Sequence, residues 1–372
     1  MSSLFNLIHL LSTGGLLLTT FLLFSKPKQE NWKANILLSV FLFFLFLAFL
    51  DECFVILSID NEGYILEELL SIVFFLMPPT FYLSVRYFAY PLKKITKKDL
   101  LHFLPAFCFT LLIVVLLLFS TVSVPTNSIQ SLGNYVSILV ILTVFLQVII
   151  YSALSLKLIQ SHQKNIYLFT SNTEEINLAW IQKFILGVIF FGFLWLIQIN
   201  LPELPNFYSI GYFLGVYYLA YFALNQKELY PFSESDTLEI AEILESKEDT
   251  SNASILIPDL TSEKNKLDEL MNHEKPYLDN ELTLPKLAHL FQTNTHQLSY
   301  LLNNGFKENF YDYVNRHRVE ESKKLLMDKK FAHLSMVGIA YEAGFNSKTT
   351  FNTAFKKFTG YTPSEYKKVN SQ

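Results

Sequence analysis

Seven long apolar stretches restrict the possible folds of this chain more than any other feature. Each has about the 20 residues that a helix needs to cross the hydrocarbon layer of a membrane. A core helix of a large soluble protein can also be apolar, but seven such runs favour a bundle of spanning helices. The stretches run over Leu4–Phe24, Ala34–Ser58, Leu69–Tyr90, Leu100–Val122, Tyr135–Ile159, Trp180–Leu201 and Phe207–Leu224.

The loops between these stretches alternate in charge. Lysine and arginine in short loops stay on the cytoplasmic side of the membrane. The second, fourth and sixth loops, Ile59–Glu68, Ser123–Asn134 and Pro202–Asn206, contain neither residue. The other loops and their flanks contain Lys26, Lys28, Lys33, Lys93, Lys94, Lys97, Lys98, Lys157, Lys164 and Lys183. This pattern predicts a multi-pass protein of the inner (cytoplasmic) membrane, with its N-terminus outside and everything after Leu224 in the cytoplasm.

Charge divides the chain into three parts. The net charge is +1 over Met1–Lys227, −9 over Glu228–Lys275 and +4 over Pro276–Gln372, within a total of −4. We predict a seven-helix sensor or anchor module at 1–226, an acidic flexible linker with a short amphipathic helix at 227–260, and a helical domain at 261–372. A further amphipathic helix near Thr261–His273 has an apolar stripe of Leu267, Leu270 and Met271.

The C-terminal part begins with two short helical patterns. In the run TLPKLAHLF, from Thr283, apolar residues recur at i, i+3, i+4 and i+7, which is one buried face of a helix. After the turn QTN, the run THQLSYLLNNG repeats the pattern with Leu298, Leu301 and Leu302. Two short helices joined by a tight turn form a helix-turn-helix, although an ordinary helical hairpin fits this pattern equally well.

A second copy of the pattern favours the helix-turn-helix. The run SMVGIAYEA is followed by Gly344, which suits a left-handed turn, and Ser347 can cap the next helix, FNSKTTFNTAFKKFTG. Between the copies, residues 309–328 predict a helix about 30 Å long, close to the 34 Å or so that separates successive major-groove faces of DNA. The whole chain is therefore predicted to be all-α.

The sequence GIAYEAGFNSKTTFNTAFKKFTGYTPSEYKK resembles the second helix-turn-helix of the AraC/XylS family of bacterial transcription regulators. LTLPKLAHLF, HQLSYLLNNGF and YVNRHRVEESKKLL resemble its first half. The resemblance covers roughly Pro276–Lys368, about a quarter of the chain. It implies two helical subdomains that read adjacent major grooves of double-stranded promoter DNA, usually to activate RNA polymerase. Membrane-bound regulators of this kind occur in some bacteria, and whether the active form is a homodimer stays open.

The resemblance assigns candidate DNA contacts at the outward start of each recognition helix. Asparagine can pair with adenine, lysine with guanine, and the threonine methyl can contact thymine, whereas solvation or phosphate contact is the simpler alternative for each residue. Many family members have arginine near Tyr300 or Thr353, and its absence weakens the expectation of guanine recognition. The candidates are Thr295, His296, Ser299 and Tyr300 in the first helix and Lys348, Thr349, Asn352 and Thr353 in the second.

Other basic residues have simpler predicted roles. Lys356 and Lys357 follow the second set and are expected to contact phosphates. Arg316 and Arg318 lie on the connecting helix with Glu320 and Glu321, and they are expected to form structural ion pairs that join the two halves.

Polar residues inside the apolar stretches are candidates for sensing a small-molecule or membrane signal. The outward loops are too short to fold as a receptor domain, so a ligand would bind in the helix bundle or at its surface. The adjacent carboxylates Asp51 and Glu52 are candidates for this site, and Pro78 and Pro79 are predicted to kink the third helix as a pivot. His9, Arg86, Gln147 and Gln198 are further polar residues in the stretches, and interfacial solvation would explain many of this set.

Enzymatic function is not indicated. The chain lacks an HExxH motif, a GxSG nucleophile motif and a phosphate-cradling glycine loop. Cys53 and Cys108 form no metal-ligand pattern, so no metal and no cofactor are expected. The alternative to a membrane-bound regulator is a transporter-like protein with a regulatory DNA-binding tail, although no internal repeat is evident.

Overall fold

The computed structural model describes residues 2–25, 31–57, 64–91, 95–120, 126–200, 207–226, 240 and 260–370. Within these ranges the chain is helical and forms no extended strand, apart from one isolated antiparallel bridge between Thr170 and Thr283, so the predicted all-α fold is confirmed. Except for Ile240 and Leu260, the predicted linker lies outside the described residues. The chain divides into two compact units, unit 1 with residues 1–160 and 178–229, and unit 2 with residues 161–177 and 230–372.

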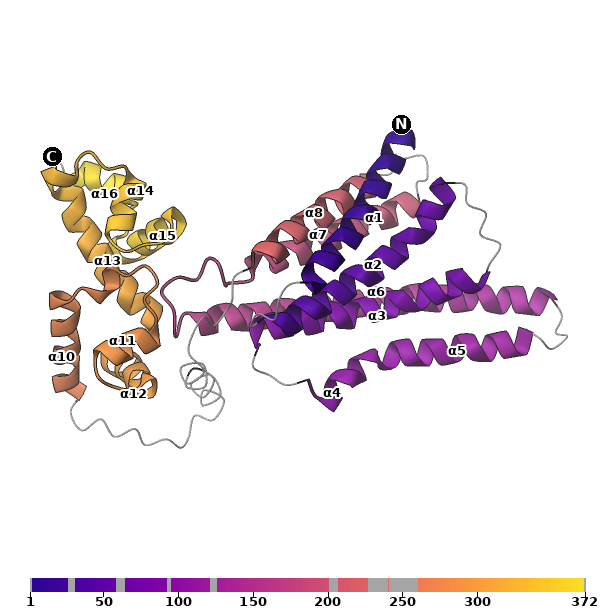
Figure 1. Ribbon diagram of the computed structural model, residues 1–372, viewed down its shortest axis with the longest axis horizontal. Helices are drawn as coiled ribbons and strands as arrows, with labels where there is room; N and C mark the ends of the chain where they lie inside the picture. Colours follow the sequence, from indigo (N-terminus) through magenta and orange to yellow (C-terminus); the bar gives the residue numbers. More distant parts are fainter. Residues whose placement is uncertain are drawn as a thin grey trace. The chain divides into compact units, whose positions relative to one another are not determined.

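Unit 1 contains every apolar stretch predicted from the sequence, and the described part of each stretch is largely helical. The longest helix, α6, has 41 residues, about 60 Å at a rise of 1.5 Å per residue, and therefore continues well beyond the predicted stretch. The helices are α1 Ser2–Phe24, α2 Trp32–Ile56, α3 Tyr64–Ala89, α4 Lys97–Leu100, α5 Leu104–Ser120, α6 Thr126–Ile166, α7 Ala179–Asn200 and α8 Phe207–Asn225 (Figure 1).

Four of these helices, rather than the seven predicted, are long and apolar enough in the described residues to cross a membrane. They are Leu4–Phe24, Trp32–Phe54, Ile72–Ala89 and Leu139–Ile166, and the apolar segment Ala179–Leu194 is shorter. The described part of α5 has 17 residues, since a 3₁₀ turn at Leu101–Phe103 precedes it and the described range ends at Ser120. The predicted stretches Leu100–Val122 and Trp180–Leu201 also extend outside the described residues. The structure thus supports four candidate spans.

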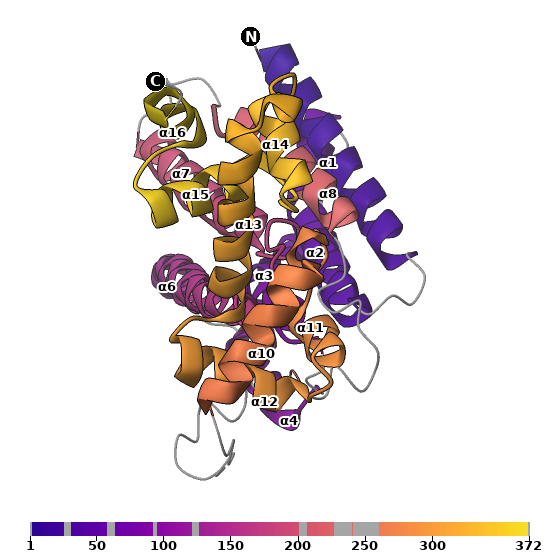
Figure 2. The ribbon, with the colours of Figure 1, turned by 90° about the vertical axis from the view of Figure 1, so that its left-hand side faces the viewer.

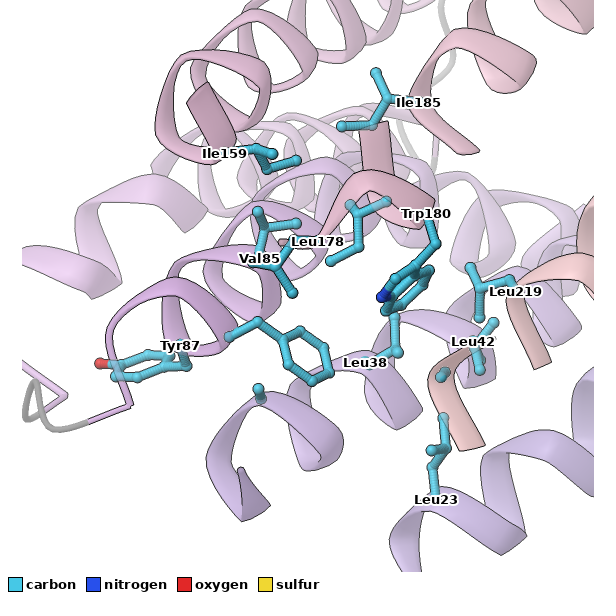
Figure 3. Packing of buried hydrophobic residues seen from close by; sticks show 14 of the residues in the cluster. Leu23, Leu38, Leu42, Val85, Tyr87, Ile159, Leu178, Trp180, Ile185 and Leu219 are labelled. Atoms are coloured by element: carbon cyan, nitrogen blue, oxygen red, sulfur yellow. The ribbon is translucent and has the colours of Figure 1, made fainter. Parts of the chain in front are cut away.

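The core of unit 1 draws apolar side chains from most of its helices. Figure 3 shows Leu23 of α1, Leu38 of α2, Val85 of α3 and Trp180 of α7 within this cluster. Large apolar side chains are also exposed over the outer faces of the helices. Phe21 and Phe107, for example, are 65% and 66% exposed. A surface of this kind suits a hydrocarbon environment better than water.

The third helix continues across its two prolines. Pro78 and Pro79 are buried, and α3 runs without interruption from Tyr64 to Ala89. Near its end Arg86 forms an ion pair with Asp99, whose carboxylate also accepts bonds from Tyr87 Oη and from the Thr96 backbone N–H. Arg86 therefore has a buried carboxylate partner, which the sequence analysis did not identify.

Unit 2 is built around one central helix. Its helices are α10 Leu260–His273, α11 Leu284–Leu290, α12 Thr295–Tyr300, α13 Phe310–Met327, α14 Met336–Glu342, α15 Lys348–Thr359 and α16 Pro363–Asn370. Figures 1 and 2 both show α13 between two groups, α10 to α12 at one end and α14 to α16 at the other. The α10 helix confirms the predicted amphipathic helix, with Leu267 and Met271 buried.

The two helix-turn-helix copies share the same local design. Each begins with a seven-residue helix, α11 or α14, capped by the side chain of Thr283 or Ser335, and each second helix is capped by Asn294 or Ser347. Such caps satisfy backbone N–H groups that have no partner inside the helix. The chain leaves both first helices through a left-handed residue, Gln292 with φ 55° or Gly344 with φ 87°. The predicted turn at Gly344 is therefore confirmed.

Gly344 also lies in a space that only glycine fits. A Cβ at this position would collide with the carbonyl oxygen of Tyr277 and would lie 2.8 Å from the Cα of Leu278. Phe345 follows directly and packs with Val319, Phe351 and Phe355 in the core that joins α13 to α14 and α15. The glycine thus lets the second helix-turn-helix pack closely against the segment before α11.

Replacing Gly344 with alanine is expected to destabilise unit 2 by about 2 to 5 kcal/mol, because left-handed strain and overpacking act together. Gly360 is the matched control. It has φ 80°, but a Cβ added there would meet nothing within 4 Å, so Gly360→Ala should cost only about 1 to 2 kcal/mol. Pulse proteolysis of the full chain across a urea series measures the free energy of unfolding of both variants. Equal losses in the two variants would contradict the close packing at Gly344.

Candidate nucleic-acid interface

The second recognition helix, α15, presents its predicted contact residues on one open face. Its inner face is held by Phe351, Ala354 and Phe355, which are buried. Lys348, Thr349 and Thr353 are exposed, and Asn352 is partly buried. A groove of about 540 Å³ brings together Met336, Lys348, Asn352, Thr353, Lys356, Lys357, Thr362, Pro363 and Ser364. The structure therefore gathers five predicted residues with three further polar or turn residues from the start of α16.

One of the two expected phosphate contacts is already paired. The Nζ of Lys357 lies 2.7 Å from Oδ1 of Asp312 on α13, whereas Lys356 is an exposed residue of the groove. Both partners of the Lys357 pair are at least partly accessible, so the pair contributes little stability and can exchange for a phosphate.

In the first recognition helix, α12, one predicted contact residue is not accessible. Thr295 is buried, at 2% exposure, and therefore does not present its side chain for base contact. The helical spacing explains this, because Thr295 precedes the buried residues Leu298 and Leu302 by three and seven positions. His296, Ser299 and Tyr300 are partly accessible, as a contact surface requires.

Two polar residues beside these positions were missed. Gln297 and Asn303 are exposed on the recognition segment, where Gln297 Oε1 accepts a bond of 2.7 Å from Thr293 and Asn303 donates to the Ser299 carbonyl. The same helical spacing, applied outward from Leu298, would have identified both residues.

The connecting helix, α13, has 18 residues, close to the predicted length. Its two arginines are structural, as expected, but their partners differ from the prediction. Arg316 pairs with Glu308, at 3.0 Å. Arg318 is fully buried and donates to the carbonyl oxygens of Tyr277 and Asp279, each at 2.7 Å. For Arg318, backbone carbonyls replace the predicted glutamate partner, because its guanidinium points into the turn before α11 instead of along its own helix.

A segment from between α6 and α7 completes unit 2. Residues 167–177, here called the α6–α7 loop, pack against the first helix-turn-helix and against α13. The Leu284 N–H donates to the Phe169 carbonyl at 2.9 Å, and the Tyr311 N–H donates to the Tyr167 carbonyl at 3.0 Å. Arg318 Nη2 donates to Ser171 Oγ at 3.0 Å. Nothing in the loop sequence indicated these contacts, because all of them are with residues more than 100 positions away.

Burial adjusts two ionisable groups at this junction. Burial lowers the pKa of Arg318 to about 10, which still leaves the guanidinium charged at neutral pH. Burial and the neighbouring Tyr167 raise the pKa of Tyr311 to about 12, so its phenol stays neutral. The junction therefore contributes one fixed positive charge, which the carbonyl and hydroxyl oxygens around it solvate.

The loop also reaches the start of the second recognition helix. Ser347 Oγ and Thr350 Oγ1 both donate to the carboxylate of Glu174, the second at 3.1 Å. Ser347 Oγ simultaneously accepts from the Thr350 N–H, at 3.1 Å, as the cap of α15. A carboxylate thus occupies the end of the helix where backbone N–H groups favour anions.

The predicted signal residues in unit 1 are only partly described. Glu52 lies 3.4 Å from His9 Nδ1, and His9 Nε2 is 3.2 Å from the Phe49 carbonyl, so these groups link α1 to α2. The side chains of Asp51 and Gln198 lie outside the described residues. In the part of the chain that the structure covers, no group of three or more His, Cys, Asp or Glu residues is placed to hold a metal ion.

Comparison with known proteins agrees with the architecture of the C-terminal unit. A family model described as a helix-turn-helix domain matches residues 287–368. An uncharacterized HTH-type transcriptional regulator in the cgkA 5′ region of Pseudoalteromonas carrageenovora is 44% identical over 54 residues, 14% of this chain and 30% of that protein. One from Staphylococcus aureus (strain COL) is 29% identical over 117 residues, 32% of this chain and 14% of that protein.

These matches establish an AraC-type helix-turn-helix domain at the C-terminus and a relationship to HTH-type transcriptional regulators. The chain spans less than a third of the length of either relative, and neither match extends over the whole of this chain. No solved structure matches the chain.

Proposed function

We propose that the protein is a membrane-bound bacterial transcription regulator that binds promoter DNA sequence-specifically through unit 2. The observation that carries the proposal is the pair of capped helix-turn-helix motifs at the two ends of α13. At 18 residues α13 is about 27 Å long, which is close to the spacing of successive major grooves. A bound RNA polymerase and a homodimeric active form belong to the same proposal.

The residues of α15 divide into base-contacting and phosphate-contacting groups. Lys348, Thr349, Asn352 and Thr353 lie at the start of the helix, where a recognition helix approaches base edges. Lys356 and Lys357 lie one to two turns further on and are placed for the phosphate backbone. Because arginine is absent from the recognition positions, lysine and asparagine carry the direct readout.

Replacing Lys348 or Asn352 with alanine should weaken binding to the preferred site by about 1 to 3 kcal/mol and relax the preference at one or two base pairs. Lys356→Ala should weaken binding to all DNA sequences similarly. It should also reduce the slope of log affinity against log salt concentration by about 1. Lys330→Ala is the control, since it removes the same charge from an exposed position outside the groove. Sequencing of the duplexes that each variant binds from a randomised library measures its preference at each base pair. Unchanged preference in both specificity variants would exclude α15 as the recognition helix.

We infer the membrane orientation from the loop charges together with the helices. If only the four candidate spans crossed, both ends of unit 1 would lie on the same side. A cytoplasmic DNA-binding unit would then place the loop with Lys26, Lys28 and Lys33 outside, against the positive-inside rule. We propose instead that α5, α7 and α8 also cross, with the N-terminus outside.

A reporter that works only in the cytoplasm should be active when fused after Lys98 or Asn225 and silent after Gly63 or Asn127. The Gly63 and Lys98 fusions separate the two arrangements, because with only four spans and a cytoplasmic DNA-binding unit Gly63 would lie inside and Lys98 outside. Activity after Gly63 and Asn127 with silence after Lys98 and Asn225 would reverse the orientation and remove access to DNA. Protein abundance measured for each fusion serves as the control.

We further propose that the signal is sensed in the membrane unit. Asp51 and Glu52 form an adjacent pair of acids in α2, and Glu52 bridges to His9 of α1. A ligand cation or hydrogen-bond donor that replaced His9 as the partner of Glu52 would alter the packing of these two helices. Pro78 and Pro79, inside α3, are the proposed pivot for that change.

The double variant Asp51→Asn with Glu52→Gln should keep membrane insertion and DNA binding but lose the signal-dependent change in reporter transcription. The amides preserve side-chain size while removing the charge. A normal response in a strain where the wild type responds would show that the signal enters elsewhere. Immunoblotting of membrane fractions establishes that the variant is present at the wild-type level.

A further inference from the structure

The α6–α7 loop makes contacts with the DNA-binding unit that DNA recognition does not require. Several contacts anchor the loop at the start of the first helix-turn-helix. Thr170 forms the antiparallel bridge with Thr283, the capping residue of α11, and Ser171 Oγ donates to the Leu282 carbonyl at 2.8 Å. Phe169 is 1% exposed, so burial of an aromatic side chain adds to these polar contacts.

This anchored loop carries a negative charge to the recognition helix. Glu174, three residues after Ser171, accepts bonds from the hydroxyl groups of Ser347 and Thr350 at the first turn of α15. A DNA phosphate beside a recognition helix seeks the same partners, namely hydroxyl groups and the positive end of the helix dipole. A fixed carboxylate there both occupies the donors and repels the incoming phosphate.

The position of the loop in the chain makes this contact adjustable. Helix α6 ends at Ile166, directly before the loop, and α7 begins at Ala179, after the single intervening residue Leu178. The loop is therefore joined to both apolar helices through a few residues, which gives a movement of either helix a short path to it. Glu174 is exposed, and an exposed interaction is worth at most about a fivefold change in an equilibrium, which suits a reversible contact.

We propose that the α6–α7 loop is an autoinhibitory element, in which Glu174 takes the place of a DNA phosphate at the start of α15. This inference rests on the proposed DNA-binding function. Binding of DNA and docking of Glu174 are competitive, and release of the loop by a shift of α6 or α7 raises affinity for DNA.

The test uses the full chain in lipid nanodiscs and a fluorescent duplex of about 40 base pairs, long enough for two major-groove sites, selected from a random library by the wild type. Glu174→Gln removes the charge and keeps the size of the side chain. It should raise affinity about two- to fivefold. Glu269→Gln is the matched control, because it removes one exposed carboxylate from α10 and should change affinity much less.

A double-mutant cycle tests whether Glu174 acts through α15. Thr350→Val deletes a hydroxyl bonded to Glu174 but keeps the backbone N–H that Ser347 caps. The increase in DNA affinity caused by Glu174→Gln should therefore be smaller when Thr350→Val is present. A gain no larger than that of Glu269→Gln, or any loss of affinity, overturns autoinhibition. Failure of the wild type to enrich any duplex instead overturns the proposed DNA-binding function, so the two failures are distinguishable.

Discussion

The buried guanidinium of Arg318 is the interaction on which the packing of unit 2 depends. It lies on α13 and binds the carbonyls of Tyr277 and Asp279 before α11, together with Ser171 of the α6–α7 loop. A charge removed from water is stable only if its hydrogen-bonding groups are satisfied, and leaving such a group unpaired costs about 3 to 5 kcal/mol. Three separate segments of the chain are consequently required to meet at one residue.

This arrangement gives the connecting helix more than the role of a spacer. Its start contacts Tyr167 of the loop, its middle holds Arg318, and its later residues Val319 and Leu326 pack with α14 and α15. The two helix-turn-helix motifs are thus held by one continuous helix whose surroundings include a segment from between two apolar helices. A DNA-binding unit built in this way is physically connected to α6 and α7 by more than the acidic linker.

Much of the fold was predictable because it follows from local patterns. The period of apolar residues located both helix-turn-helix motifs, and the long apolar runs located the main helices of unit 1. Gly344 and Ser347 were recognisable from the conformations they favour. The number of candidate spans was not determined in this way: a 3₁₀ turn precedes α5, and the predicted stretches Leu100–Val122 and Trp180–Leu201 extend outside the described residues. Thr295 is buried rather than available for base contact, because its helical spacing from Leu298 places it on the inner face of α12.

The sequence alone determined which segments are helical and which faces are apolar, because both depend on residues within about one helical turn of one another. The DNA-binding domain was indicated by the family resemblance over roughly Pro276–Lys368. Only the tertiary structure decided that Arg318 binds carbonyls, that Lys357 pairs with Asp312, and that Glu174 meets Ser347. These partners lie between 39 and 173 residues apart in the chain. Packing of whole helices brings these residues together, and no local sequence pattern indicates contacts between residues so far apart in the chain.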